Sequence, residues 1–123
     1  MSFSYLKFIY QNPYTDAKKD KLYPLCVVEI RELGYPVRTK TGNWGRGIVA
    51  EIGCQSGKTA YGNAVWSGDP REEYNFVVGA KKALDRALRF GGVQFAPDVR
   101  KHIWDAFNDA IKLVEKGEWN SDR

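Results

Sequence analysis

The stretch LCVVEIREL, from Leu25 to Leu33, decides the fold class. At its centre the apolar residues Val28 and Ile30 alternate with charged residues, which is the two-residue period of a strand with one face toward a core. β-Branched residues are frequent in it, and they favour extended backbone. Gly34 and Pro36 follow and are expected to end the strand. The stretch therefore predicts a half-buried strand of an antiparallel sheet.

Three further segments have strand character: Phe3 to Tyr10, Arg46 to Ile52 and Lys58 to Trp66. Glycines occur in the segments that separate the last three of the four strand candidates, as is typical of antiparallel turns. One of these, Gly53 to Thr59, resembles a phosphate-binding loop. However, three residues separate its glycines where that motif has four, and a strand follows where the motif needs a helix. We therefore expect a hairpin turn at this point.

The rest of the chain has the period of two helices. The first is expected to begin at Asp69-Pro70 and to end at Gly91-Gly92, because these residue types favour helix starts and stops. The second is expected to begin at Ala96-Pro97-Asp98. We expect a single domain, with residues 1–66 mostly β, residues 69–116 forming two helices and residues 117–123 a frayed tail. The predicted fold is α+β, an antiparallel sheet of about four strands followed by two C-terminal helices packed on it.

Composition excludes several classes of protein. The aromatic share of 14%, with 43% hydrophobic and 28% charged residues, excludes a disordered or low-complexity chain. No apolar run reaches the roughly 18 residues of a transmembrane helix, and the first residues lack the features of a signal peptide. Cys26, Cys54 and the single histidine, His102, have no zinc-site spacing. We therefore expect buried reduced thiols, no metal, no cofactor, no membrane and a cytoplasmic location.

A basic, glycine-rich segment carries one tryptophan. It is Gly42 to Gly47, with Arg38 and Lys40 just before it, in a chain whose net charge of +4 permits an anionic partner. Cations beside a stacking ring can bind a nucleotide or a single-stranded nucleic acid. The alternative is a solvated hairpin whose tryptophan folds back onto the sheet. The candidate nucleic-acid residues are Arg38, Lys40, Trp44 and Arg46.

A second group of cations lies on the first predicted helix. Lys82 and Arg86 are four residues apart and share a face, and Arg89 is three residues further on. Such a row can grip phosphates, although a charged face is also ordinary for a helix exposed to solvent. Gly79 lies in the middle of the same helix, where glycine is costly, and indicates a close approach by another helix, a second subunit or a ligand.

Several residues between Gly62 and Trp104 form a combined pattern: a small-residue strand, an acidic-aromatic helix start, a mid-helix glycine and an Ala-Leu-x-Arg-Ala-Leu run. The residues are Gly62-Asn63-Ala64-Val65, Asp69-Pro70, Tyr74-Asn75-Phe76, Gly79, Lys82-Ala83-Leu84, Arg86-Ala87-Leu88, Val99-Arg100 and Ile103-Trp104. This pattern resembles a motif of small bacteriophage-encoded proteins and is most similar to the first type of anti-Thoeris protein. The resemblance implies a homo-oligomer that sequesters a cyclic ADP-ribose signal and so blocks a host defence.

A protein of that kind needs rings to stack on adenine and cations to hold a diphosphate, but no nucleophile. The candidate ligand-binding residues, at the junction of the last strand and the first helix, are Asn63, Trp66, Tyr74, Phe76, Lys82, Arg86 and Arg89. No serine or cysteine nucleophile can be assigned to His102, which favours a binding protein over an enzyme. The alternatives are a small phage nucleic-acid-binding module, or a protein inhibitor of a host defence complex such as an anti-CRISPR.

Overall fold

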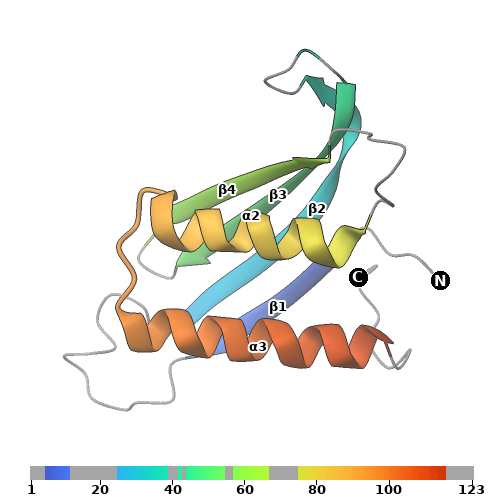
Figure 1. Ribbon diagram of the computed structural model, residues 1–123. Coiled ribbons are helices and arrows are strands. Elements are labelled where there is room, and N and C mark those ends of the chain that lie inside the picture. The colour runs from blue at the N-terminus through green and yellow to red at the C-terminus, as the bar shows by residue number, and fades with distance from the viewer. Residues whose placement is uncertain are drawn as a thin grey trace.

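The computed structural model describes residues 5–11, 25–38, 42, 44–54, 57–66 and 75–115. In these ranges the elements are β1 (Tyr5–Gln11), β2 (Leu25–Arg38), β3 (Trp44–Cys54), β4 (Thr59–Trp66), α2 (Phe76–Phe90) and α3 (Pro97–Glu115). The described strands form one antiparallel sheet in the order β1-β2-β3-β4. Figure 1 shows both helices on one face of it. The predicted α+β fold is confirmed, and the predicted tail, residues 117–123, lies outside the described residues.

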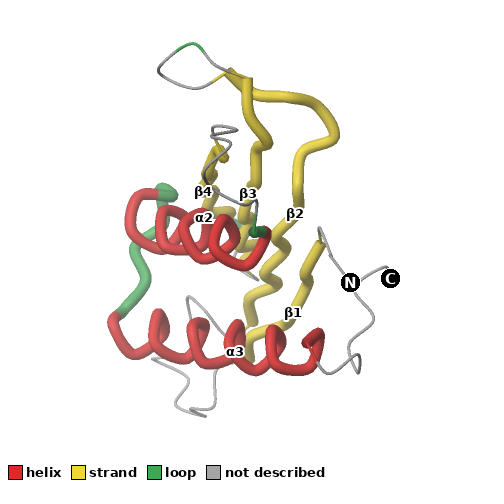
Figure 2. The backbone as a smooth tube through the Cα atoms, turned by 45° about the vertical axis from the view of Figure 1, so that its right-hand side comes forward, coloured by secondary structure: helices red, strands yellow, loops and turns green. Residues whose placement is uncertain are grey.

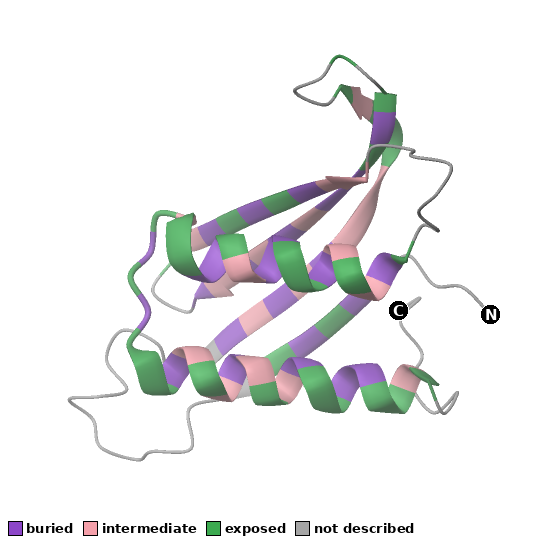
Figure 3. Ribbon diagram, viewed as in Figure 1, coloured by how far each residue is buried: buried purple, intermediate pink, exposed green. Residues whose placement is uncertain are grey.

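The core lies between the sheet and the helices. The strand register places Phe8, Val28 and Ile52 side by side, and none of them is more than 5% exposed. Figure 3 shows the resulting alternation of buried and exposed residues along the strands. From α3, Phe107 is fully buried and meets Phe8 edge to face, with 6.2 Å between ring centroids. The alternation that predicts the strands therefore also identifies the face that the helices cover.

Two glycines let α2 lie close to the sheet. A Cβ at Gly62 on β4 would collide with backbone atoms of Ala83 and Ala87. At Gly79, a Cβ would collide with the Cδ1 atom of Ile48 on β3. The close approach predicted from Gly79 is thus made by a side chain of the same sheet. Gly79 by itself gives no reason to invoke a second subunit or a ligand.

The start of α2 differs from the sequence prediction. The helix begins at Phe76 and not at Asp69, so the predicted start is wrong for this helix. Asn75 is its N-cap: the side-chain oxygen accepts hydrogen bonds from the backbone N–H groups of Val77 (2.9 Å) and Val78 (3.3 Å). Residues 67–74, which include Asp69, lie outside the described residues.

The other helix boundaries agree with the prediction. Helix α2 ends at Phe90, before Gly91 and Gly92, and Gly92 has a φ of +92° that favours glycine. Helix α3 begins at Pro97, as the proline predicts. Neither of these helices is long and apolar enough to cross a membrane.

The β3–β4 connection is a tight hairpin. The N–H of Cys54 donates to the carbonyl oxygen of Lys58 (2.8 Å), and the N–H of Gly57 donates to that of Cys54 (2.9 Å). A strand follows it directly. The prediction of a turn at this point is therefore confirmed, and the helix that a phosphate-binding loop needs does not follow it.

Strands β2 and β3 are both longer than predicted. β2 continues through Gly34 and Pro36 to Arg38, and β3 begins at Trp44, so most of the predicted basic loop is strand. Proline is tolerated because the pairing of β2 with β3 shifts register between Glu32 and Pro36, where the ladder of hydrogen bonds is interrupted. We call the two-stranded extension formed by Leu33–Arg38 and Trp44–Gly47 the arm. Figure 2 shows it extending beyond the helices and the rest of the sheet.

Candidate functional site

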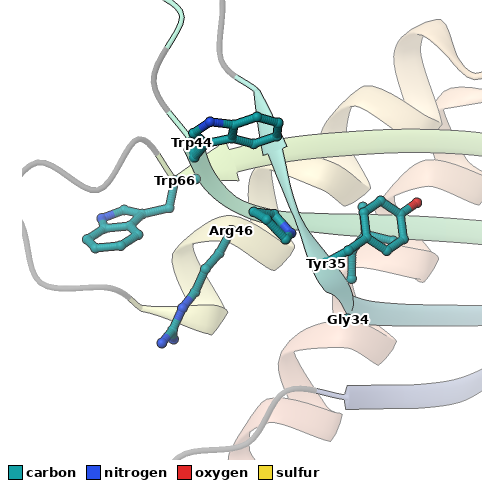
Figure 4. A pocket seen from close by; sticks show the side chains of 8 residues that line it. Gly34, Tyr35, Trp44, Arg46 and Trp66 are labelled. Atoms are coloured by element: carbon teal, nitrogen blue, oxygen red, sulfur yellow. The ribbon is translucent and has the colours of Figure 1, made fainter.

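A pocket of about 340 Å³ lies on the arm, where β2, β3 and the end of β4 meet. It is lined by Leu33, Gly34, Tyr35, Pro36, Trp44, Gly45, Arg46 and Trp66; we call it the arm pocket (Figure 4). It joins Trp66, from the predicted ligand-binding set, to Trp44 and Arg46, from the predicted nucleic-acid set. Two candidate sites that are separate in the sequence therefore meet at one place.

The strand register places these residues beside one another on neighbouring strands. Arg46 on β3 lies opposite Pro36 of β2 on one side and Trp66 of β4 on the other. Trp44 is two residues from Arg46 on the same strand, so both leave the same face. Figure 4 shows Tyr35, Trp44, Arg46 and Trp66 spread around the twisted arm rather than stacked on one another. The pocket is therefore a shallow site that presents rings and a cation to solvent.

Two arginines place positive charge at the arm pocket. Arg38 places its guanidinium carbon 5.4 Å from the centroid of the Trp44 ring, and its Nε donates to the carbonyl oxygen of Gly42 (3.2 Å). Arg46 pairs loosely with Glu32, with 3.8 Å between Nε and Oε1. The side chain of Arg46 is 56% exposed and Trp44 is 61% exposed. An exposed indole that Arg38 covers, in a pocket that Arg46 also lines, can bind a flat ring that carries negative charge.

Asn63 and Arg86, both members of the predicted ligand-binding set, are in contact. Nη1 of Arg86 donates to the backbone carbonyl oxygen of Asn63, 2.6 Å away. Because β4 is at the edge of the described sheet, this hydrogen bond satisfies an edge carbonyl and ties α2 to the sheet. The contact therefore gives Arg86 a structural role, whatever else it binds.

The remaining described residues of the predicted ligand-binding set do not join one site. Phe76 is only 5% exposed and belongs to the core, so we correct its assignment as a stacking ring. Lys82 is exposed on α2. Arg89 pairs with Asp85 (3.4 Å) near the end of α2. Tyr74, and Lys40 of the nucleic-acid set, lie outside the described residues.

Tyr35 is a pocket residue that the sequence reasoning missed. It is 65% exposed and lines the arm pocket. Gly34 and Pro36, on either side of it, predict only the end of a strand, so Tyr35 is not among the predicted site residues. An exposed aromatic residue between two residues that disrupt strand pairing is the signal that identifies it.

The two cysteines are buried neighbours in the sheet. Cys26 lies opposite Cys54 in the β2–β3 register, and their Sγ atoms are 3.7 Å apart. Burial, and then the neighbouring Cys54, raises the pKa of Cys26 to about 12; burial also raises the pKa of Cys54. Thiols that stay protonated are poor nucleophiles and poor metal ligands. In the described part of the chain, no group of three His, Cys, Asp or Glu side chains is placed to hold a metal ion.

Known proteins add no further evidence about this site. Comparisons of the chain with protein-family models, with curated proteins and with solved structures find no match. The case for a function therefore rests on the geometry of the arm pocket and on the sequence resemblance.

Proposed function

We propose that this protein binds a cyclic nucleotide signal of the cyclic ADP-ribose type and sequesters it unchanged, acting as a bacteriophage anti-defence protein in the host cytoplasm. The observation that carries the proposal is the arm pocket, which gathers Trp44, Trp66 and Arg46. An adenine ring stacks on an indole, and a diphosphate takes a guanidinium group. The volume of about 340 Å³ falls in the range of small-molecule pockets, roughly 300–1,000 Å³.

Sequestration without cleavage is part of the proposal. A hydrolase or transferase would need an activated nucleophile or a base beside the bound ligand. Cys26 and Cys54 are buried in the sheet with raised pKa values. His102 lies on α3, and the arm pocket contains none of these three residues. These placements support a protein that holds its ligand rather than one that transforms it.

Calorimetry tests the proposal. Isomers of cyclic ADP-ribose and a panel of cyclic oligonucleotides are titrated into the protein and into its Trp44→Ala and Arg46→Ala variants. We expect at least one ligand to bind, and each variant to weaken it about tenfold, as for loss of a stacked ring or a charge-assisted hydrogen bond. Lys81→Ala, which removes an exposed cation of α2, is the control and should leave binding unchanged. Absence of binding by every member of the panel would overturn the proposal.

A second candidate function is the binding of single-stranded nucleic acid along the arm. The contact of Arg38 with the exposed ring of Trp44 favours it, because cations and stacking rings are the elements of such sites. Labelled single-stranded DNA and RNA are titrated at several salt concentrations. Nucleic-acid binding predicts an affinity that falls steeply with salt and that is reduced in Arg38→Ala and Arg46→Ala. An affinity that changes neither with salt concentration nor in the two variants would contradict nucleic-acid binding along the arm.

We also propose that the protein is a homo-oligomer. On the sheet face that the helices leave uncovered, Ile9 is 62% and Tyr61 is 55% exposed, and a second copy would cover them. Light scattering at high concentration is the test. A mass of 14.0 kDa, that of one chain, would contradict this part of the proposal.

A further inference from the structure

The two helices border a groove on the outside of the molecule. A cavity of about 390 Å³ and a second of about 730 Å³ adjoin there, and Leu88, Arg89 and Arg100 line both. We call this surface the interhelical groove and define it by Leu88, Arg89, Phe90, Val93, Arg100 and Trp104. Figure 1 shows α2 and α3 running in opposite directions, and Val93 lies in the segment that joins the end of α2 to the start of α3.

The groove exists because each helix packs on a different part of the sheet. Helix α2 contacts mainly β4 and β3, whereas α3 contacts β1, so the described helix backbones lie closer to the sheet than to one another. Apolar side chains close the space from below, since Leu88 is 3% and Val93 is 9% exposed. Trp104 packs edge-on against Phe107, with ring centroids 5.7 Å apart, and forms a wall. The groove therefore has an apolar floor.

The cations of the groove outnumber its carboxylates by one. Arg89, Arg100 and Lys101 line the two cavities together with Asp85 and Asp105. Arg89 already pairs with Asp85. Arg100 is partly buried and lines both cavities, yet within the described residues its guanidinium group makes no hydrogen bond or ion pair. Arg100 is therefore an available partner for one carboxylate.

Phe90 gives the groove an apolar rim. It is 78% exposed, more than any other large hydrophobic side chain in the described ranges. The guanidinium carbon of Arg89 lies 5.7 Å from the centroid of its ring, so a cation and an exposed ring stand side by side at the mouth of the groove. An apolar side chain inserted beside Phe90 and Val93 would bury this ring.

We propose that the interhelical groove docks an acidic, hydrophobic segment of a partner protein, with one apolar side chain in the cavity and one carboxylate on Arg100. A surplus of a single positive charge suits a single carboxylate. A nucleic acid or a diphosphate would bring several negative charges against Asp85 and Asp105, which lie in the same groove. This site is separate from the arm pocket, so the inference does not depend on the proposed function.

The experiment begins with a displayed library of random peptides of about twelve residues, selected on the intact protein. We expect enrichment of peptides that carry Asp or Glu close to Trp, Phe or Leu. One enriched peptide is labelled with fluorescein and titrated by fluorescence polarisation. Arg100→Ala should weaken its binding about tenfold or more, and Phe90→Ser at least about fivefold. Lys112→Ala, which removes an exposed cation of the same helix α3, should change it less than about twofold.

Circular dichroism establishes that each variant is folded. Phe90→Ser is the safer of the two, because an exposed side chain contributes little to stability. The inference is overturned if no acidic, hydrophobic peptide is enriched, or if the enriched peptide binds Arg100→Ala and Phe90→Ser as it binds the original chain. It is also overturned if inorganic diphosphate or a labelled oligothymidylate binds in a manner lost in Arg100→Ala while peptides do not. Loss of peptide binding in Arg100→Ala with unchanged nucleotide binding would separate this site from the arm pocket.

Discussion

The close contact between Gly62 and α2 makes Gly62→Ala the most informative single substitution for the fold. Gly62 lies on β4 beneath the helix, and a new Cβ would collide with the backbone of Ala83 and Ala87. Backbone atoms of a helix cannot rotate away as a side chain can. The helix must therefore shift outward, which loosens its contacts with β4 and β3.

The magnitude follows from two opposing effects. Overpacking of this kind costs about 1–3 kcal/mol, and displacement of a backbone puts the expected cost at the upper end. Replacing glycine restricts the unfolded chain and returns roughly 0.4–1 kcal/mol. We therefore expect Gly62→Ala to lower the free energy of unfolding by about 2 kcal/mol. In a domain of this size, that corresponds to a melting temperature lower by roughly 6–12 °C.

Urea unfolding followed by circular dichroism measures the change, and Gly53→Ala is the matched control. Gly53 lies on the neighbouring strand β3, and its nearest atom to a new Cβ is the carbonyl oxygen of Val27 at 3.9 Å, which is an ordinary contact. The control should be as stable as the original chain or slightly more stable. Equal stability of Gly62→Ala and Gly53→Ala would refute the packing of α2 on β4.

Three further predictions follow from local features. Asn75→Ala removes the N-cap of α2 and should lower the free energy of unfolding, measured with urea, by about 1 kcal/mol. Asn75→Asp should retain most of the stability that the cap contributes, because aspartate is also a good N-cap. Equal losses in the two variants would contradict the cap. Phe107→Ala empties a fully buried site and should cost about 3–5 kcal/mol, and a loss under about 1 kcal/mol would place this ring outside the core. The pKa of Cys26, raised to about 12 against about 8.5 in an unfolded chain, means that the folded state holds its proton more tightly. This contribution to stability is complete below about pH 8.5 and is lost as pH rises toward 12. Between pH 8 and 11, the free energy of unfolding measured with urea should therefore fall less steeply with pH in Cys26→Ala than in the original chain. Identical slopes would contradict burial of the thiol.

The sequence predicts the sheet and the helix layer well because both depend on local periodicity. The alternation around Val28 and Ile30 identifies β2. Gly91 marks the end of α2, and Pro97 marks the start of α3. The N-cap of α2 is harder to predict, since Asp69 and Asn75 are both good capping residues. Which of them begins α2 depends on where the helix meets the sheet, and that contact involves residues distant in the sequence, such as Ile48.

The candidate site is only partly predictable for a similar reason. Trp44 and Arg46 stand out as a ring and a cation in a glycine-rich segment, and Trp66 stands out at the end of a strand. Their meeting depends on the pairing of β3 with β4, which local patterns do not reveal. The burial of Phe76 is also hard to predict. Its place at the start of α2 does not reveal which way its ring faces, and only the packing of the helix on the sheet buries it in the core.

We propose that the arm pocket holds a cyclic nucleotide and leaves it intact. The most direct measurement incubates the protein with cyclic ADP-ribose isomers, removes unbound ligand by gel filtration and heats the protein to release what it holds. Mass spectrometry then identifies the released molecule. We expect release of an unchanged isomer, and much less of it from Arg46→Ala than from Lys81→Ala. Release of a hydrolysed product, of nothing, or of equal amounts from both variants would contradict it.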